Sequence, residues 1–372
     1  MKAVGIILAG GKNLKMRELS MTRALAAMPV AGAFRCIDFT LSNMTNSQIK
    51  KVAVLSQYNA RSLNEHLASS KWWNFGRKQG GLYVFTPTLT PDNSWFYRGT
   101  ADAMHQNLDW LKRCNEPYVV VSNGDAVYKL NYEELLFYHI EKDADITIAV
   151  KDLPGEDVSR FGVVKMNDDN RIISFIEKPM VTDLDTVSAG IYVLRRDFLI
   201  ELLESAAEED KYSFVSDIIV RCINSKKIYG YKIHDYWSNI STVESYYKTN
   251  MDFLDPKIRS YFFKQEPYIY SKVSDLPPAK FNEGSDVRNS LVASGSIING
   301  KVENSVLFKH VFVGKNCTIK NSIVLNEVYI GDNTYLENCI VDSRGNIEPN
   351  MKIVGGREIN IVVGKSTRYG SK

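Results

Sequence analysis

The residues best suited to chemistry stand in the first loop of the chain, directly after an apolar strand predicted over residues 4–8. That strand ends in Leu8-Ala9-Gly10-Gly11, and basic side chains follow at Lys12, Lys15 and Arg17. The backbone N–H groups of a glycine loop, with cations beside them, can bind the phosphates of a nucleotide. Two glycines are also common in ordinary tight turns, so the loop needs support from further motifs.

The elements that must position this loop alternate along the first 255 residues. Apolar runs predict strands over 4–8, 51–55, 118–122 and 146–150, and helical stretches lie at 62–67, 101–113 and 132–142. This alternation predicts an α/β fold with a doubly wound, mainly parallel sheet and helices on both faces. Ligands bind at the carboxyl ends of such strands, so the residues after Leu8 and Ser122 are the candidate site.

The last part of the chain has a different period. Three units recur with a spacing of 17 residues: Glu303-Asn304-Ser305-Val306, Lys320-Asn321-Ser322-Ile323 and Glu337-Asn338-Cys339-Ile340. Apolar residues also recur in steps of five or six, at Val302, Phe308, Val313, Ile319, Leu325, Ile330 and Leu336. A near-hexapeptide period with asparagine at the corners is typical of a parallel β-helix. The alternative, a β-sandwich, would carry turns about every 8–12 residues.

Prolines between these two parts mark a connector, with Pro256, Pro267, Pro277 and Pro278. A chain of 372 residues is long enough for a large domain and a smaller one. We therefore predict an α/β domain over 1–255, a linker over 256–284 and a β-helix domain over 285–372. Open ends and faces of a β-helix are usually capped or paired, so we expect oligomerisation through this domain.

The composition argues against several classes of protein. A net charge of +3 gives no sign of a nucleic-acid or membrane partner. The five cysteines are scattered without a CxxC pair, as expected of reduced core cysteines rather than of disulfides or a zinc site, and the five histidines are equally dispersed. The first apolar run is too short to span a bilayer and lacks a cleavage pattern, so we expect a cytoplasmic protein.

A long, ordered set of motifs connects the first loop to the rest of the chain. The set comprises Arg23-Ala24, Pro29-Val30-Ala31-Gly32, Phe34-Arg35-Cys36-Ile37-Asp38-Phe39, Leu41-Ser42-Asn43, Gln57-Tyr58-Asn59, Ser62-Leu63-Asn64, Tyr97-Arg98-Gly99-Thr100-Ala101-Asp102-Ala103, Asn123-Gly124-Asp125 and Phe175-Ile176-Glu177-Lys178-Pro179. Over essentially its whole length the chain resembles the ADP-glucose pyrophosphorylase (glucose-1-phosphate adenylyltransferase) family. The resemblance implies a nucleotidyltransferase domain followed by a left-handed β-helix.

The resemblance also implies a reaction in which glucose 1-phosphate attacks the α-phosphorus of ATP and releases pyrophosphate, a step governed by cations and positioning. It places the nucleotide on Leu8, Ala9, Gly10, Gly11 and Gly99. The family's loop has the sequence Gly-Gly-x-Gly-Thr/Ser-Arg-Leu, with proline two residues later. Here Asn13 replaces the third glycine, Leu14 the small hydroxyl residue, Lys15 the arginine and Glu18 the proline. Lysine keeps one charge but lacks the planar fork that binds two phosphate oxygens.

Two further departures remove a cation and a metal ligand. In the family's Arg-Ala-Lys-Pro-Ala motif the lysine has become Leu25. The family holds Mg²⁺ with two aspartates, of which the first is kept as Asp125 and the second has become Asn239. The family's catalytic positions are thus Lys15, Asp125 and Asn239, the metal site at Asp125 is incomplete, and we expect Mg²⁺ to bind weakly or not at all. Losing one carboxylate would cost several kcal/mol, on the order of a thousandfold in rate.

By contrast, the sugar-phosphate side matches the family. The resemblance assigns the sugar hydroxyls to Glu177, the phosphate to Lys178, and neighbouring substrate contacts to Gly162 and Ser188. The alternative is structural, because exposed Glu–Lys pairs are usually nearly neutral in energy. We expect this half of the site to bind a sugar phosphate or a nucleotide still.

These departures most resemble the non-catalytic regulatory subunit (GlgD) of bacterial glycogen biosynthesis. That resemblance implies a hetero-oligomer, expected to be a tetramer, with a catalytic ADP-glucose pyrophosphorylase subunit. Two alternatives stay open: an active but divergent sugar-phosphate nucleotidyltransferase that uses Asp125, Lys15 and Arg17, or a non-enzymatic scaffold of the same fold. Family effectors bind near the junction of the domains, where Arg35, Gln57 and Arg61 are candidates or structural residues.

Overall fold

The computed structural model describes residues 2–76, 80–88, 96–356 and 358–363. The chain forms two compact units that alternate along the sequence. The first unit consists of Met1–Gly11 and Phe39–Trp237, and the second of Lys12–Asp38 and Ser238–Lys372. The first loop therefore divides between the two units directly after Gly11. The domain boundaries predicted at residues 255 and 285 follow sequence motifs and stay a prediction.

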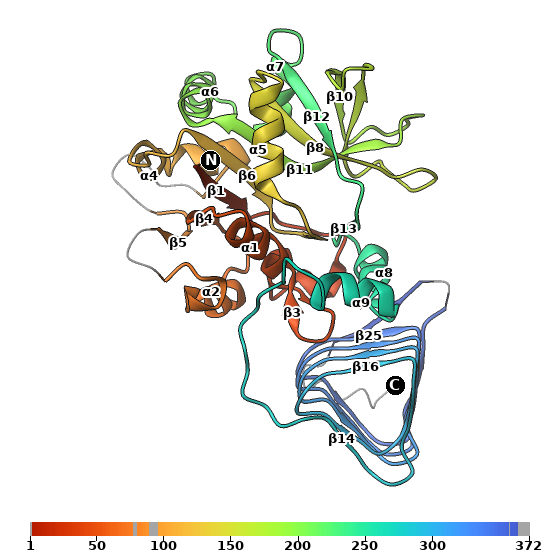
Figure 1. Ribbon diagram of the computed structural model, residues 1–372. Helices are drawn as coiled ribbons and strands as arrows, with labels where there is room; N and C mark the ends of the chain where they lie inside the picture. Colours follow the sequence, from red (N-terminus) through yellow and green to blue (C-terminus); the bar gives the residue numbers. More distant parts are fainter. Residues whose placement is uncertain (1, 77–79, 89–95, 357, 364–372) are drawn as a thin grey trace. The chain divides into compact units, whose positions relative to one another are not determined.

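The first unit is built around a mixed sheet (Figure 1). Its strands are β1 (Ala3–Leu8), β4 (Lys51–Leu55), β5 (Gly81–Phe85), β6 (Tyr118–Asn123), β8 (Ile146–Asp152), β9 (Gly162–Met166), β10 (Ile172–Glu177), β11 (Thr186–Arg195) and β12 (Ile228–Lys232). They follow the order β10-β9-β11-β6-β1-β4-β5, and β8 pairs with both β11 and β12. Strands β6, β1, β4 and β5 are parallel, whereas β11 is antiparallel to β6 and β8. The predicted α/β class is confirmed, and the four predicted strands are β1, β4, β6 and β8.

Helices cover both faces of this sheet. They are α1 (Cys36–Asn46), α2 (Arg61–Leu67), α3 (Thr100–His105), α4 (Leu108–Lys112), α5 (Tyr132–Glu141), α6 (Arg196–Glu208) and α7 (Val220–Cys222), the last preceded by a π-helical turn over Phe214–Ile219. On β8, Ile148 shares a core with Leu199 of α6. The next residue back, Thr147, bonds His139 of α5 at 2.8 Å. Because successive strand residues point to opposite faces, α5 and α6 lie on opposite sides of the sheet.

The predicted helix over 101–113 is interrupted. The structure has α3 and α4 there, with a break at Gln106 and Asn107. The Asn107 Nδ2 donates 2.8 Å to the carbonyl of Ala103 and 3.0 Å to the Tyr97 hydroxyl. Side chains that bond nearby backbone groups compete with regular helix, which accounts for the break. Among the described residues, no helix combines the length and apolar character that a bilayer-spanning segment requires.

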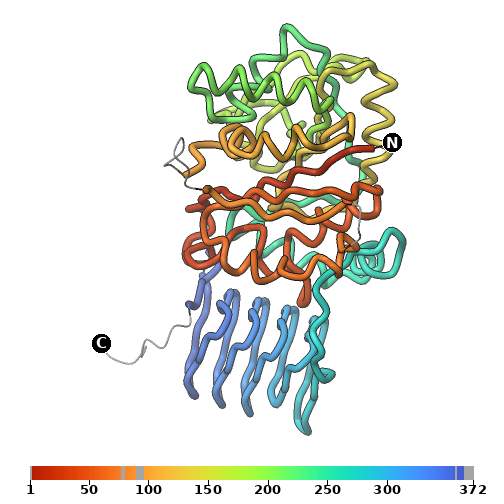
Figure 2. Tube along the Cα trace, turned by 90° about the vertical axis from the view of Figure 1, so that its left-hand side faces the viewer, coloured from red at the N-terminus to blue at the C-terminus, as the bar shows by residue number. Residues whose placement is uncertain are grey.

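The second unit contains the predicted parallel β-helix, seen end on as a triangle in Figure 1 and from the side in Figure 2. One sheet holds β14 (Lys280–Phe281), β17 (Ile297–Ile298), β20 (Phe312–Val313), β23 (Tyr329–Ile330) and β26 (Asn346–Ile347). The next holds β15 (Asp286–Arg288), β18 (Lys301–Glu303), β21 (Thr318–Lys320), β24 (Tyr335–Glu337) and β27 (Lys352–Val354). The third holds β16 (Leu291–Val292), β19 (Val306–Leu307), β22 (Ile323–Val324), β25 (Cys339–Val341) and β28 (Asn360–Val362). All of these pairs are parallel.

The sequence repeat sets the register of the coils. Val302 pairs with Ile319, and Ile319 with Leu336, and all three side chains are buried in the interior. Corner asparagines adopt positive φ, including Asn304, Asn321 and Asn338 at 45°, 46° and 52°. Asparagine tolerates this left-handed conformation better than most residues, which explains its place in the repeat. The corners at Asn316, Asn333 and Asn350 are further joined by side-chain amide bonds of 3.2 and 3.0 Å.

Helix α8 (Val243–Asp252) ties the early part of the second unit to the β-helix. The Tyr246 hydroxyl donates to the Pro29 carbonyl at 2.7 Å, and the Tyr247 hydroxyl donates to the Asn321 carbonyl at 2.7 Å. The short strands β2 (Pro29–Val30) and β3 (Phe34–Arg35) and helix α9 (Pro256–Phe263) complete this part. The stretch 256–284, predicted as a linker, contains α9 and β14.

Candidate functional site

The carboxyl ends of three parallel strands meet at the start of the first loop. The Ala9 N–H donates to the Leu55 carbonyl at 2.8 Å, and the Gly124 N–H donates to the Leu8 carbonyl at 3.0 Å. A Cβ on Gly10 would lie 3.3 Å from the backbone nitrogen of Gln57, closer than a side chain normally packs. The structure thus brings Leu8, Ala9 and Gly10 to the edge where ligands bind in open α/β sheets.

Gly11 and Asp125 occupy less constrained places at the same edge. A Cβ on Gly11 would meet no atom within 4 Å, so this glycine leaves open space. Asp125 lies half-buried in the turn between β6 and β7 (Ala126–Tyr128). The base of that turn is held by a buried hydroxyl cluster in which Tyr128 contacts Ser122 at 2.9 Å and Tyr132 at 2.6 Å. Burial raises the pKa of the Tyr128 hydroxyl, so it stays a neutral hydrogen-bonding group.

The sugar-phosphate candidates come together on β9, β10 and β11. Gly162 pairs with Glu177 across the strands, and a Cβ there would lie 2.4 Å from the Phe175 ring and 2.8 Å from Glu177 Oε2. The Lys178 ammonium lies 3.4 Å from Glu177 Oε1 and is 65% exposed, whereas Glu177 is 25% exposed. The pair therefore offers an accessible cation beside a sheltered carboxylate, the two groups that the resemblance assigns to phosphate and sugar hydroxyls.

Ser188 has a partner that the sequence reasoning missed. Its hydroxyl lies 3.2 Å from the Tyr192 hydroxyl. Burial raises the pKa of Tyr192, and the charge of Glu177 raises it further, so Tyr192 stays protonated beside the carboxylate. Between them, Gly190 has φ of +73°, and a Cβ there would lie 2.4 Å from Asn123 Nδ2. A tyrosine four residues after the predicted serine was the available signal.

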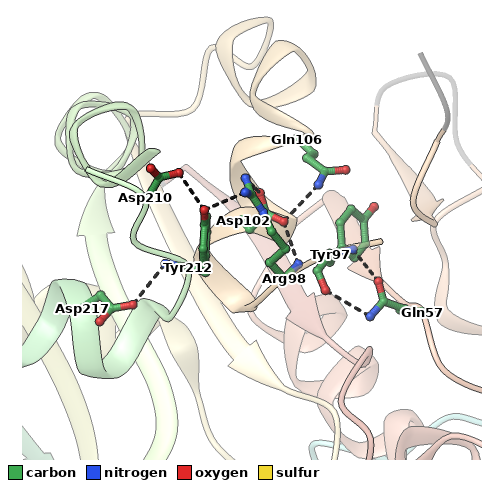
Figure 3. A network of polar contacts seen from close by, with 8 residues as sticks. All are labelled: Gln57, Tyr97, Arg98, Asp102, Gln106, Asp210, Tyr212 and Asp217. Atoms are coloured by element: carbon green, nitrogen blue, oxygen red, sulfur yellow. Dashed lines mark hydrogen bonds and ion pairs between the residues drawn. The ribbon is translucent and has the colours of Figure 1, made fainter. Parts of the chain in front are cut away.

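Gly99 belongs to a polar network in the first unit (Figure 3). The network contains Gln57, Tyr97, Arg98, Asp102, Gln106, Asp210, Tyr212 and Asp217. A Cβ on Gly99 would lie 2.2 Å from the Tyr212 carbonyl oxygen, which accepts the Ala101 N–H at 2.8 Å. The Arg98 guanidinium stacks 3.9 Å from the Tyr212 ring centre and donates 2.6 Å to its hydroxyl. Gly99 is thus required for close backbone packing, whatever ligand it contacts.

Gln57 takes part in the same network through two backbone bonds. Its Nε2 donates to the Tyr97 carbonyl at 3.2 Å, and its Oε1 accepts the Tyr97 N–H at 2.6 Å (Figure 3). Of the three effector candidates, Gln57 and Arg61 belong to the first unit and Arg35 to the second. Arg35 donates 3.4 Å to the Ala27 carbonyl. An effector role for these residues stays a prediction.

The rewritten half of the first loop lies in the second unit. Leu14 is 76% exposed, and Lys15 is exposed as well. Arg17 has φ of 51° and lies 3.7 Å from Glu18 and 3.6 Å from Glu358. Leu25 is half-buried in a short 3₁₀ turn over Leu25–Ala27. Arg17 is therefore already paired with two carboxylates inside this unit.

Asn13 and Asn239 both use their carboxamides within the same unit. The Asn13 Oδ1 accepts the N–H groups of Lys15 at 2.8 Å and Met16 at 3.2 Å, and its Nδ2 donates to the Ser241 carbonyl at 2.8 Å. Asn239, at the end of β13 (Trp237–Asn239), is 8% exposed, and its Oδ1 accepts the Ser241 N–H at 2.9 Å. Within the part of the chain that the structure describes, no group of three or more His, Cys, Asp or Glu residues could hold a metal ion.

Comparison with known proteins extends over both parts of the chain. The nucleotidyl transferase family model matches residues 4–256, and the GlmU-like C-terminal hexapeptide model matches residues 277–359. The glucose-1-phosphate adenylyltransferase of Clostridium novyi (strain NT) is 38% identical over 321 residues, which cover 85% of this chain and 84% of that protein. The protein of the same name from Clostridium perfringens (strain 13 / Type A) is 37% identical over 373 residues, covering 99% and 95%.

A third relative of the same name, from Geobacillus stearothermophilus, is 36% identical over 321 residues, which cover 86% of this chain and 83% of that protein. The hexapeptide match and the parallel coils are consistent with the predicted left-handed β-helix. The family match spans more than half of the chain, and the relatives cover most of it. The chain therefore belongs to the glucose-1-phosphate adenylyltransferase (ADP-glucose pyrophosphorylase) family of nucleotidyltransferases.

Proposed function

We propose that this chain is a regulatory, catalytically impaired subunit of glucose-1-phosphate adenylyltransferase in glycogen biosynthesis, of the type that tunes a catalytic partner subunit. The observation that carries the proposal is a contrast between two halves of the site. Nucleotide-side cations and carboxylates are replaced at Lys15, Leu25 and Asn239. On the sugar-phosphate side, Gly162, Glu177 and Ser188 keep their identities and lie on neighbouring strands.

Loss of charge on the nucleotide side supports impaired turnover. Transfer to the α-phosphorus of ATP brings two anions together, so its rate depends on cations that are positioned before the reaction. Leu25 supplies no charge where the family has lysine, and Lys15 binds oxygens as a point charge without the arginine fork. Arg17, the nearest alternative cation, lies close to Glu18 and Glu358, which offset its charge.

The residues at the family's metal positions do not fit a two-carboxylate magnesium site. Mg²⁺ is a hard cation that prefers charged oxygen ligands. Of the two positions, Asp125 keeps a carboxylate, whereas the amide of Asn239 is neutral and its oxygen already accepts the Ser241 N–H. We therefore propose that Mg²⁺ binds weakly or not at all, and that the missing charge lowers the rate by on the order of a thousandfold.

The sugar-phosphate side supports retained binding of a ligand. The exposed Lys178 ammonium can pair with a phosphate, while Glu177 accepts hydrogen bonds from sugar hydroxyls and Tyr192 holds Ser188 in place. Calorimetry with glucose 1-phosphate should therefore detect binding that Lys178→Ala and Glu177→Gln weaken. Absence of binding by any sugar phosphate or nucleotide would favour a non-enzymatic scaffold.

The partner in this proposal is a catalytic ADP-glucose pyrophosphorylase subunit, in a hetero-oligomer that we expect to be a tetramer. A cytoplasmic location agrees with five cysteines that are free and buried. The test is to measure ADP-glucose synthesis by this chain, by the catalytic chain of the same organism and by their mixture. We expect little turnover from this chain alone, and a changed rate or effector response in the mixture. Failure to co-purify, together with additive kinetics, would contradict the proposal.

A second candidate, an active but divergent sugar-phosphate nucleotidyltransferase, is favoured by the printed names of the relatives and by the retained Asp125. In that case the purified single chain should turn over at rates ordinary for an adenylyltransferase. Asp125→Ala should abolish this turnover, because the remaining carboxylate would be lost. Robust activity that survives Asp125→Ala would point to a contaminating enzyme and support neither candidate.

A further inference from the structure

The rewritten part of the first loop is closed on itself by one side chain. The Asn13 carboxamide oxygen accepts the backbone N–H groups of Lys15 and Met16, at 2.8 and 3.2 Å. The Ser20 hydroxyl donates to the Asn13 carbonyl at 2.6 Å, and the Arg17 N–H bonds the Leu14 carbonyl at 3.1 Å. The loop is thus folded around Asn13, and two consecutive N–H donors are already used.

The same side chain is anchored at its other end. Its Nδ2 donates to the carbonyl of Ser241 at 2.8 Å, although Ser241 lies 228 residues further along the chain. The N–H of Ser241 in turn donates to Asn239 Oδ1 at 2.9 Å. One chain of hydrogen bonds therefore joins Asn13, Ser241 and Asn239. Asn13 and Asn239 are two of the positions at which the sequence departs from the family's pattern.

We propose that Asn13 is an internal substitute for a bound anion, which holds the nucleotide loop closed without any ligand. Successive backbone N–H groups in a tight loop are the donors with which proteins bind phosphate oxygens. Here a neutral carboxamide oxygen occupies them, and its own amide nitrogen is fixed on Ser241. A phosphate must displace this oxygen before it can use the same donors. We call the contacts of Asn13 with Lys15, Met16 and Ser241 the Asn13 latch.

The inference deepens the proposed function, because it explains how the nucleotide side is kept closed as well as depleted of charge. It rests on a different observation, namely the hydrogen bonds of one side chain. An asparagine that merely suited a turn would need no long-range donor bond to Ser241. The latch would therefore make the loop's shape independent of nucleotide, whatever the role of the chain in an assembly.

The test compares anion binding by the full chain and its Asn13→Gly variant. The probes are inorganic pyrophosphate and ATP, titrated calorimetrically without magnesium. Freeing two N–H donors should tighten pyrophosphate binding by about tenfold. The matched control is Asn282→Gly, which also removes a carboxamide bond in the second unit, at 2.7 Å to Asn299, and should leave pyrophosphate binding unchanged.

Hydrogen exchange supplies a second readout in the same samples. The amides of Lys15 and Met16 should exchange faster in Asn13→Gly, and pyrophosphate should restore their protection in the variant more than in the natural protein. If Asn13→Gly fails to fold, Asn13→Ser removes the Ser241 anchor with a smaller change and should show the same trends. Unchanged pyrophosphate affinity overturns the inference, whatever the exchange rates.

The two proposals fail separately. Co-purification with a catalytic subunit tests the regulatory role and does not involve Asn13. A latch without any partner, or a partner without a latch, would each be recognised from these measurements.

Discussion

The replacement Asn239→Asp restores a carboxylate where the family has one, at a place whose surroundings are known. The side chain is 8% exposed, and its oxygen accepts the Ser241 N–H at 2.9 Å. Among the described residues, the Asn239 Nδ2 donates no hydrogen bond, so exchanging nitrogen for oxygen breaks none. The local backbone should therefore tolerate the change, and its consequences should be electrostatic.

Two opposing magnitudes follow from this geometry. Without metal, a nearly buried carboxylate that accepts one N–H bond should destabilise the protein by about 1–3 kcal/mol. With Mg²⁺, a second anionic ligand becomes available, so binding should recover part of this loss. Several kcal/mol of transition-state stabilisation would raise the rate by roughly a hundredfold to a thousandfold. We expect this gain only in combination with Leu25→Lys and Asn13→Gly, because the cation and the open loop are also missing.

The assay measures thermal unfolding with chelator and with Mg²⁺, followed by ADP-glucose synthesis. The matched control is Asn250→Asp, which places a carboxylate at a fully buried position that accepts the Ala31 N–H at 3.0 Å. It also loses the amide bond to the Tyr246 carbonyl at 3.0 Å, so it should be destabilised with or without Mg²⁺. The reasoning fails if Asn239→Asp gains no stability from Mg²⁺ and the triple variant gains no activity.

Three further predictions concern stability and are checked by denaturant or thermal unfolding. Gly99→Ala should cost several kcal/mol, about 3 or more, because its Cβ would lie 2.2 Å from the Tyr212 carbonyl oxygen; unchanged stability would contradict this packing. Arg23→Ala should cost about 3–5 kcal/mol, because it leaves the Asp342 carboxylate, 9% exposed and 2.6 Å from Arg23, without its cation; replacing both by leucine should cost less. Burial lowers the pKa of His139 to about 4 from 6.5, so its neutral form is favoured in the fold. Stability should be fully present above pH 6.5 and fall as the pH drops toward 4, by about 3 kcal/mol at most, and His139→Gln should flatten this slope.

The β-helix could be predicted in detail because one repeat encodes both its interior and its corners. Val302, Ile319 and Leu336 stack at the spacing of the repeat, and Asn304 and Asn321 take the left-handed corners. The first coil is less regular, since Val287 pairs with Val302 only 15 residues later. A local period of this kind needs no knowledge of distant contacts.

The direction of the strands and the break in the helix over 101–113 could not be predicted in the same way. An apolar run looks the same whether a strand runs parallel or antiparallel, so the reversal of β11 left no mark in the pattern. The helical period continues through Asn107, and the interruption comes from the bond between its side chain and the Ala103 carbonyl.

The site divides along similar lines. The motif residues Gly162 and Glu177 do lie opposite each other, because the motifs coincide with paired strands. The bond between Ser188 and Tyr192 depends on a kink at Gly190, where a positive φ changes the pairing of β11. The Asn13 latch depends on Ser241, which no spacing argument connects to the first loop.

The regular coil length gives the β-helix the properties of a ruler. Removal of one 17-residue turn would shorten it by one strand spacing, about 4.8 Å, and return each remaining interior residue to an interior column. Removal of 16 residues would instead rotate every later side chain by one position and expose the aliphatic columns. Changes of length are therefore tolerated here in whole turns, and the distance between the two ends of this domain can vary only in discrete steps.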